Sequence, residues 1–236
     1  EQDHIIKAIS FELSNVARPY IRERVVDHLC RICRDLAGGV AKNLGIELKQ
    51  EQMEYTIPGP VNGLKDGDPA LSLYGSGEQV IKSRRVSILV GDGVCGHGVE
   101  NAKKALAAEG VNVQRLSDKL GTVKTKDGKE LEVGGLFRAN PSLFFDAVLV
   151  PDSGNIGILM KDGDARYHLC QAYKHCKPIV LLGEAEKMLN AAGLPAAGDD
   201  AGLVAGEVEQ VMPDFLKAMK QHRIWEHEPK TASVSA

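Results

Sequence analysis

The chain of 236 residues contains 43% hydrophobic and 26% charged residues, a composition typical of packed globular proteins and unlike that of disordered ones. Its formal net charge of −3 creates no strong field that would attract phosphate backbones or anionic lipids, so neither nucleic acid nor a membrane is an expected partner. No apolar run approaches the roughly 18 to 20 residues that span a bilayer, and the five cysteines do not fix the compartment.

Two amphipathic helices are predicted near the start of the chain, within a helical segment that we place at residues 1–48. The first begins at Pro19, which suits the first turn of a helix, and its apolar positions are Ile21, Val25, Leu29 and Ile32. The second runs from Asp35 to Leu44 and ends at Gly45. Because two short helices hardly form a core, we expect their apolar faces to pack against another part of the protein.

The helical pattern is lost between residues 49 and 85, where prolines and glycines are mixed with polar residues. This composition is typical of a linker. A linker of this length is unusual inside one compact domain, so we expect two structural units.

Strands and helices alternate from residue 86 to residue 225. The predicted strands are Val86–Val90, Val111–Leu116, Ala147–Val150 and Ile179–Leu182, and the predicted helices are Val99–Glu109, Asp164–His175, Glu184–Ala192 and Pro213–Gln221. Asp127-Gly128 predicts the turn of an inserted hairpin. Apolar strands that alternate with amphipathic helices predict an α/β fold of flavodoxin-like type, a doubly wound and mostly parallel sheet with helices on both faces. Residues 226–236 are expected to form a flexible tail.

The loop after the first predicted strand is a candidate site. Gly91–Gly96 matches G-x-G-x-x-G, a pattern that lets a pyrophosphate approach a helix N-terminus. A structural turn is favoured, because the helix does not clearly begin until after Gly98 and a hairpin follows the second strand. Cys95 and His97 are weak candidates for a thiolate and its base, since residues two apart in a glycine-rich loop do not naturally face each other.

Two further groups of residues are weaker candidates. Ser153 follows a predicted strand but lacks the G-x-S-x-G elbow that exposes a nucleophile, so a turn is favoured. His28, Cys30 and Cys33 offer three possible metal ligands, and no fourth ligand is spaced nearby. We therefore predict no metal site.

The stretch FELSNVARPYIRERVVDHLCRICRDLAGGVAKNLGI, Phe11–Ile46, resembles the closing helices of large-subunit monofunctional haem catalases, and the sequence from Val86 onward resembles their extra C-terminal domain. The resemblance implies a parent protein, with a fungal one favoured, that is a homotetramer and converts hydrogen peroxide to water and oxygen. It also implies an extracellular or cytoplasmic location, which the sequence does not decide. The haem and its distal His and Asn and proximal Tyr lie upstream of this chain in that family. The chain is thus expected to hold no cofactor, and to contact the catalytic domain and neighbouring subunits of the parent.

That C-terminal domain is in turn similar to the PfpI-type, class I glutamine-amidotransferase-like superfamily of hydrolases, glycation-repair enzymes and stress chaperones. A nucleophilic cysteine there follows the strand matched by Ile179–Leu182, but this sequence has Gly183 and then Glu184. Pro151–Asn155 keeps one of the two glycines of the oxyanion-hole turn, and no acidic partner is evident after the first strand. The resemblance implies a retained fold without its covalent chemistry.

An interaction module is the expected function, one that stabilises the tetramer and acts as a holdase-type chaperone for partly unfolded clients. The expected client-binding positions are apolar residues outside the α/β domain: Ile5, Ile6, Ile9, Phe11, Leu64, Leu71 and Leu73. These residues equally permit the alternative that they fold back onto the α/β domain and leave the chain inert. The second hypothesis is a small-molecule hydrolase with Cys95 or Ser153 as nucleophile, or an enzyme that binds a nucleotide at Gly91–Gly96.

Overall fold

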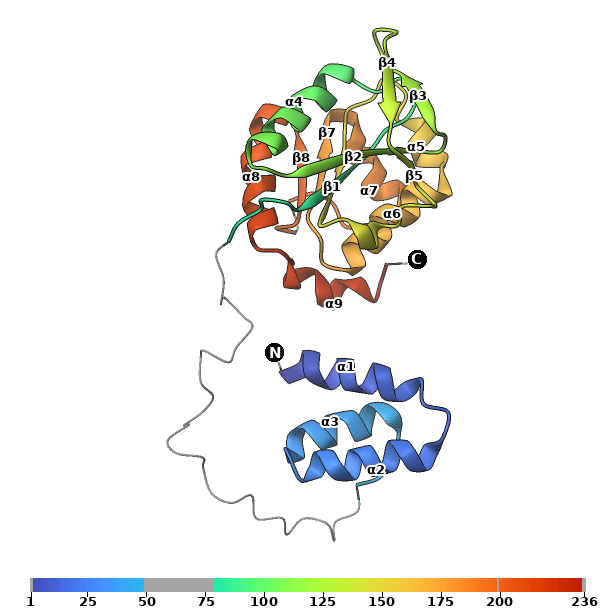
Figure 1. The fold of residues 1–236 in the computed structure, drawn as a ribbon, viewed down its shortest axis with the longest axis vertical. Helices are drawn as coiled ribbons and strands as arrows, with labels where there is room; N and C mark the ends of the chain where they lie inside the picture. Colours follow the sequence, from blue (N-terminus) through green and yellow to red (C-terminus); the bar gives the residue numbers. More distant parts are fainter. Residues whose placement is uncertain (1, 49–78, 199, 235–236) are drawn as a thin grey trace. The chain divides into compact units, whose positions relative to one another are not determined.

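The computed structural model describes residues 2–48, 79–198 and 200–234. The chain divides into two compact units, Glu1–Ser76 and Gly77–Ala236, and Figure 1 shows the first as helical and the second as α/β. Most of the expected linker, residues 49–78, lies outside the described residues. No helix in the described part of the chain is long and apolar enough to cross a membrane.

The described part of the helical unit contains α1 (Gln2–Ser14), α2 (Pro19–Cys30) and α3 (Arg34–Leu44). As predicted, α2 begins at Pro19, and α3 ends at Gly45, whose φ of 66° is the left-handed conformation of a helix cap. The sequence pattern did not predict α1, which contacts α3. The buried apolar side chains described in this unit come from all three helices: Leu13, Val26, Leu29, Ala37, Val40 and Ala41.

The expectation that the two predicted helices need a distant partner is corrected by α1. Its Leu13 lies in one cluster with Leu29 and Val40, so three helices share a small core where two were predicted to lack one. The predicted apolar stripe is also too long. Because α2 ends at Cys30, Ile32 falls beyond the helix and is 66% exposed.

A six-stranded parallel sheet forms the centre of the α/β unit, in the order β5-β2-β1-β6-β7-β8. Its strands are β1 (Arg85–Leu89), β2 (Asn112–Ser117), β5 (Gly135–Leu136), β6 (Ala147–Val150), β7 (Ile179–Leu182) and β8 (Leu203–Gly206). The order changes direction between β1 and β6, and ligand sites of such sheets form at the carboxyl ends of the strands at this point. The predicted flavodoxin-like fold is confirmed, although β5 and β8 were not predicted.

Helices cover both faces of the sheet (Figure 1). One face carries α4 (Gly96–Ala108) and α8 (Val208–Lys220), and the other carries α5 (Gly157–Lys161), α6 (Gly163–Lys174) and α7 (Lys187–Ala191). Successive strand residues enter opposite cores, so Ile88 packs with α4 and α8 while Leu89 packs with α5, α6 and α7. Burial on both faces explains why the strands read as continuous apolar runs.

The predicted hairpin is confirmed as β3 (Gly121–Lys124) and β4 (Glu130–Val133), with Gly128 at a φ of 80° in the turn. Short 3₁₀ helices complete the connections: η3 (Ser142–Phe144), η4 (Gly183–Glu186) and η5 (Trp225–His227).

Residues 226–234, which we expected to belong to a flexible tail, are folded and partly buried. They contain α9 (Glu228–Thr231) after η5, and both His227 and Val234 are buried. The sequence did not predict this packing, because the segment is polar and its contacts come from residues far away in the chain.

Candidate functional site at the carboxyl ends of the strands

The loops that follow β1 and β6 bind each other at the switch point of the sheet. The Cys95 N–H donates to the carbonyl of Asp152 at 2.8 Å, and the Gly154 N–H donates to the carbonyl of Gly93 at 3.0 Å. Val94 also forms a β-bridge with Ser153. The sequence-predicted loops are therefore brought together, as the topology requires, but backbone hydrogen bonds close the space between them.

The glycines of the G-x-G-x-x-G pattern are explained by close packing. Gly93 has a φ of +90°, and a Cβ there would lie 3.0 Å from the Cβ of Asn155. A Cβ on Gly96 would lie 2.9 Å from the Thr125 Cγ2 in the β3–β4 connection. The Gly93 N–H donates to the Lys124 carbonyl at 2.7 Å. Protein atoms therefore occupy the space beside the loop and accept hydrogen bonds from its backbone N–H groups, both of which a bound pyrophosphate needs.

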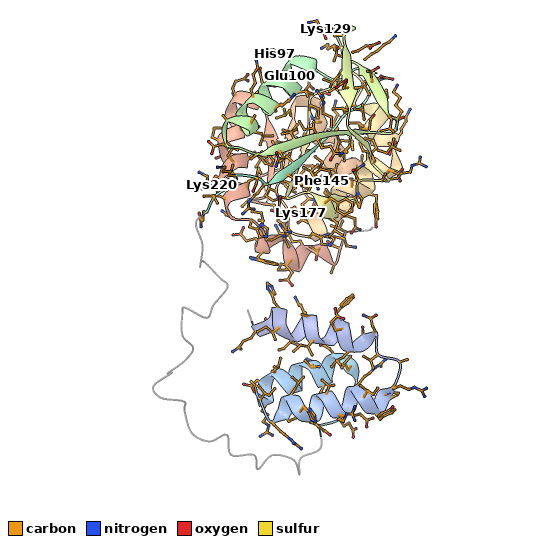
Figure 2. The ribbon with its side chains drawn as sticks, viewed as in Figure 1. His97, Glu100, Lys129, Phe145, Lys177 and Lys220 are labelled. Atoms are coloured by element: carbon orange, nitrogen blue, oxygen red, sulfur yellow. The ribbon has the colours of Figure 1, made fainter. Side chains whose placement is uncertain are left out.

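The helix after this loop begins earlier than predicted. α4 starts at Gly96, so His97 is helical, and its Nε2 lies 3.0 Å from the Nδ2 of Asn101 one turn later. Among the described residues, Cys95 has no hydrogen bond to His97. The structure thus does not assemble the weak thiolate and base pair, and Figure 2 shows His97 near the end of the unit that carries Lys129.

Gly183, which the resemblance matches to a nucleophile position, lies against a side chain of the neighbouring loop. Gly183 has a φ of +54°, and a Cβ there would lie 2.8 Å from Oδ1 of Asp152. The same Oδ1 accepts the Glu184 N–H at 3.0 Å, and Glu184 forms an ion pair with Lys187. A thiol side chain at Gly183 thus requires Asp152 to move.

Ser153 and Asp92 hold the loops after β6 and β1 in place. The Ser153 Oγ accepts the Asn155 N–H at 3.1 Å, and only 6% of Ser153 is exposed. Asp92 binds the Lys119 Nζ at 2.7 Å and the Lys124 N–H at 2.8 Å, and these two hydrogen bonds lower the pKa of its carboxyl group. Asp92 therefore fixes the hairpin to the loop after β1. The described residues contain no group of three or more His, Cys, Asp or Glu side chains that could hold a metal ion.

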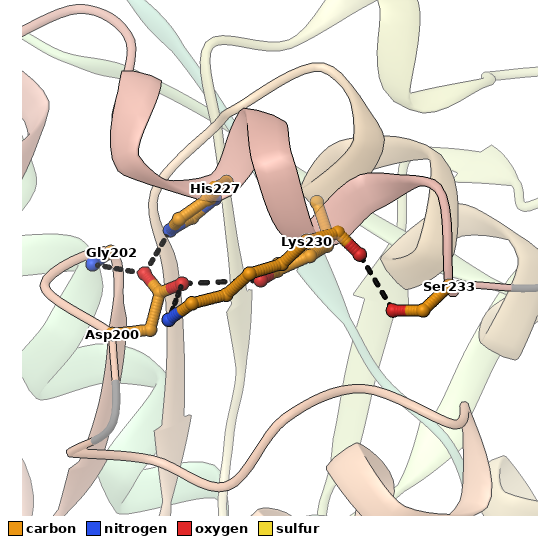
Figure 3. A network of polar contacts seen from close by, with 6 residues as sticks. Asp200, Gly202, His227, Lys230 and Ser233 are labelled. Atoms are coloured by element: carbon orange, nitrogen blue, oxygen red, sulfur yellow. Dashed lines mark hydrogen bonds and ion pairs between the residues drawn. The ribbon is translucent and has the colours of Figure 1, made fainter.

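A buried polar network near the C-terminus was missed by the sequence analysis (Figure 3). The Asp200 carboxylate accepts the Tyr173 hydroxyl at 3.1 Å and the Gly202 N–H at 3.1 Å, and it pairs with His227 and, at 3.5 Å, with Lys230. The Tyr173 and His227 rings stack with centroids 4.4 Å apart. Burial lowers the pKa of His227, while the Asp200 charge opposes this shift. This network joins α9 to α6 and to the loop before β8.

A second buried group lies at the end of the unit away from His97, where Figure 2 labels Phe145 and Lys177. The Lys177 Nζ donates to the carbonyl of Ser142 at 2.6 Å, and burial lowers the pKa of Lys177 to about 8. The His168 Nε2 lies 2.9 Å from the Ser87 Oγ, and burial followed by the Lys177 charge lowers the pKa of His168 to about 4. The residues of this group come from separate parts of the chain, on β1, on η3 and on or after α6, so no local sequence pattern predicts their contacts.

The expected client-binding positions differ in exposure. Ile5 is 47% and Phe11 is 67% exposed on α1, while Ile6 and Ile9 are partly buried and pack against the helical core. The other three expected positions lie outside the described residues: Leu64, Leu71 and Leu73.

Comparisons with known proteins identify the family. A family model described as "C-terminal domain found in long catalases" matches residues 82–229, and one described as "Catalase-related immune-responsive" matches residues 1–44. Catalase HPII of Pseudomonas aeruginosa is 36% identical over 100% of this chain and 32% of its own length. Catalase-B of Dictyostelium discoideum is 34% identical over 100% of this chain and 34% of its own length. The chain thus spans about a third of these relatives, and it belongs to the long catalases as a C-terminal domain of that family.

Proposed function

We propose that this chain is a non-catalytic domain that stabilises the tetramer of a haem catalase degrading hydrogen peroxide. One observation supports the absence of catalysis in this proposal. At the turn after β7, the Asp152 carboxylate limits the space for a side chain at Gly183. Without a nucleophile the superfamily reaction has no covalent step. Removal of this domain from the parent is expected to lower the temperature at which the tetramer dissociates, measured by size-exclusion chromatography after heating. An unchanged dissociation temperature contradicts the stabilising role.

Haem is the cofactor that the family implies, and three buried His and Tyr side chains of the described residues do not fit it. An axial ligand must present a free His, Tyr or Cys atom to the iron. His168, Tyr173 and His227 are instead enclosed in the packed core of the described structure, each at most 2% exposed. We therefore assign the haem to the part of the parent outside this chain.

The holdase part of the proposal is supported by apolar exposure on α1. Ile5 and Phe11 are exposed on this helix, and exposed apolar side chains offer area for contact with other apolar surfaces. Ile6 and Ile9 contribute less apolar area, because they also pack against the core of the helical unit.

Light scattering of a heat-sensitive client enzyme tests the holdase proposal. The 236-residue chain is added from sub-stoichiometric to equimolar amounts, with albumin as the crowding control. Suppression of aggregation well beyond that of albumin is expected, and the double variant Ile5→Lys and Phe11→Lys is expected to lose it. Ala8→Lys, an exposed position on the same helix, is the matched control and retains the effect. If the wild-type chain behaves like albumin, the holdase proposal is abandoned.

The alternative function, a hydrolase or a nucleotide-binding enzyme, has less support. Cys95 lacks a hydrogen bond to His97 in the described structure, and three backbone donors of the Gly91–Gly96 loop are used within the protein. Thermal stabilisation by a dinucleotide, or turnover of an ester that Cys95→Ala abolishes, would favour this alternative.

A further inference from the structure

The outer edge of β8 offers backbone hydrogen-bonding groups. β8 pairs with β7 on one side only, because it is the last strand of the sheet. The Ile179 N–H donates to the carbonyl of Gly202 at 2.8 Å. This bond shows which residues of β8 direct their backbone groups toward β7, because successive residues of a strand point to opposite sides. Val204 therefore directs its backbone groups toward β7, while Ala205 directs its N–H and C=O outward. No described residue outside the sheet bonds these two groups of Ala205.

A groove of about 650 Å³ lies along this edge. Val204 and Ala205 line it from β8, Ala218 lines it from α8, and Ala197 and Gly198 line it from the connection between α7 and β8. The side chains at these positions are small, so the backbone of an additional strand can approach the edge closely. Such an unpaired edge is a template for strand addition.

The rim of the groove carries more negative than positive exposed charge. Glu186 and Asp214 lie on opposite sides of β8, on η4 and α8, and both are exposed. Lys217 is the exposed cation among the described rim residues. No ion pair of Glu186 or Asp214 is found within the described residues. A basic side chain on either face of an added strand thus meets a carboxylate.

The same charges argue against a second copy of this chain as the occupant. Two β8 edges that pair with each other would bring the carboxylates of both copies to a shared rim. Like charges placed opposite each other destabilise such a pairing.

We propose that the β8 edge and its groove bind an extended peptide segment with basic side chains, which adds to the sheet as a further strand. The Ala205 N–H and C=O supply the backbone pairing, and Glu186 and Asp214 supply the preference for basic residues. This site belongs to the α/β unit, so it does not depend on the holdase proposal for Ile5 and Phe11.

Nuclear magnetic resonance titration of the isotopically labelled chain tests this proposal. The probe is the blocked pentapeptide acetyl-Val-Lys-Val-Arg-Val-amide, compared with acetyl-Val-Glu-Val-Glu-Val-amide at the same concentration. The basic peptide is expected to shift the Ala205 amide resonance and to slow its hydrogen exchange. The acidic peptide is expected to bind about tenfold more weakly, as electrostatic specificity predicts.

Two variants separate the backbone and charge contributions. Ala205→Pro removes the outward N–H and is expected to abolish the shifts. An edge strand tolerates proline at a position where the missing N–H faces away from the sheet. The double variant Glu186→Arg and Asp214→Arg leaves the strand unchanged and is expected to reverse the preference in favour of the acidic peptide. Glu109→Arg, an exposed position on the loop after α4, is the matched control and retains the original preference.

Three results would overturn the proposal. The first is the absence of shifts at Ala205 with the basic peptide. The second is that the charge-reversed variant keeps the wild-type preference between the two peptides, or that neither protein distinguishes them. The third is sedimentation of the wild-type chain as a dimer that Ala205→Pro dissociates, because a second copy would then occupy the edge.

Discussion

Gly183 is the residue that the sequence resemblance matches to a nucleophile position, and the Asp152 side chain lies beside it. Its φ of +54° is unfavourable for a side chain, and a Cβ there would lie only 2.8 Å from the Oδ1 of Asp152. Asp152 in turn accepts the Glu184 N–H. A cysteine restored by mutation would therefore disturb this contact before it acted as a nucleophile.

Gly183→Ala is expected to lower the free energy of unfolding by more than Gly193→Ala. Gly193 also has a positive φ, +66°, but a Cβ there meets nothing within 4 Å, so its variant carries only the backbone cost of about 1 to 2 kcal/mol. The contact with Asp152 is expected to add about 1 to 3 kcal/mol at Gly183. Urea denaturation of both variants measures the difference. Equal losses would mean that Asp152 moves aside freely.

His168 is expected to make the α/β unit less stable in mild acid. Its pKa of about 4 in the folded protein lies below the ordinary value of 6.5. The unfolded chain therefore binds more protons than the folded chain below pH 6.5, and stability falls as the pH drops from 6.5 toward about 4. The loss amounts to at most about 3 kcal/mol.

Urea denaturation across this pH range, on the wild type and on His168→Gln, checks the expectation. The variant should have a lower stability near neutral pH, since it disturbs the buried contact with Ser87, but a flatter pH dependence. His97→Gln, at an exposed position, serves as the control and should keep the wild-type slope. Parallel pH profiles of the wild type and His168→Gln would assign the acid sensitivity to another group.

At the scale of the elements, the C-terminal segment depends on contacts with distant parts of the chain. α9 and η5 are short, and a helix of this length does not form alone. The Ile224 N–H donates to the carbonyl of Cys176, and His227 stacks on Tyr173 and pairs with Asp200. The segment thus covers α6 and satisfies a buried carboxylate.

Truncation after Arg223 is expected to destabilise the α/β unit by about 3 to 5 kcal/mol, because it removes both the Lys230 cation and the His227 ring from the buried Asp200 carboxylate. Thermal and urea denaturation measure the loss. The double change, truncation combined with Asp200→Asn, should recover part of it by removing the unpaired charge. A truncated chain as stable as the wild type would show that the segment contributes little.

At the scale of the whole molecule, the hydrophobic clusters follow the two units. Among the described residues, the clusters on the two faces of the sheet draw on residues from 81 onward, and the cluster of α1, α2 and α3 draws on residues up to 46. Each unit therefore has its own apolar core.

Residues 79–236 produced alone are expected to keep the α/β fold and its thermal midpoint within a few degrees of that in the 236-residue chain. Circular dichroism and calorimetry on the two proteins check this. Loss of cooperative unfolding in residues 79–236 would show that the core of the α/β unit is insufficient by itself.

The sequence by itself determined the α/β class, the parallel strands β6 and β7, the hairpin and the family resemblance. These follow from continuous apolar runs, a turn dipeptide and motifs, which are local properties of the chain. Only the tertiary structure decided that α1 completes the helical core, that Asp152 fills the position beside Gly183, that Asp200 binds the C-terminal segment, and that Ala205 lies on an unpaired edge. Each of these depends on residues far apart in the sequence that meet after folding, and no local periodicity encodes such a meeting.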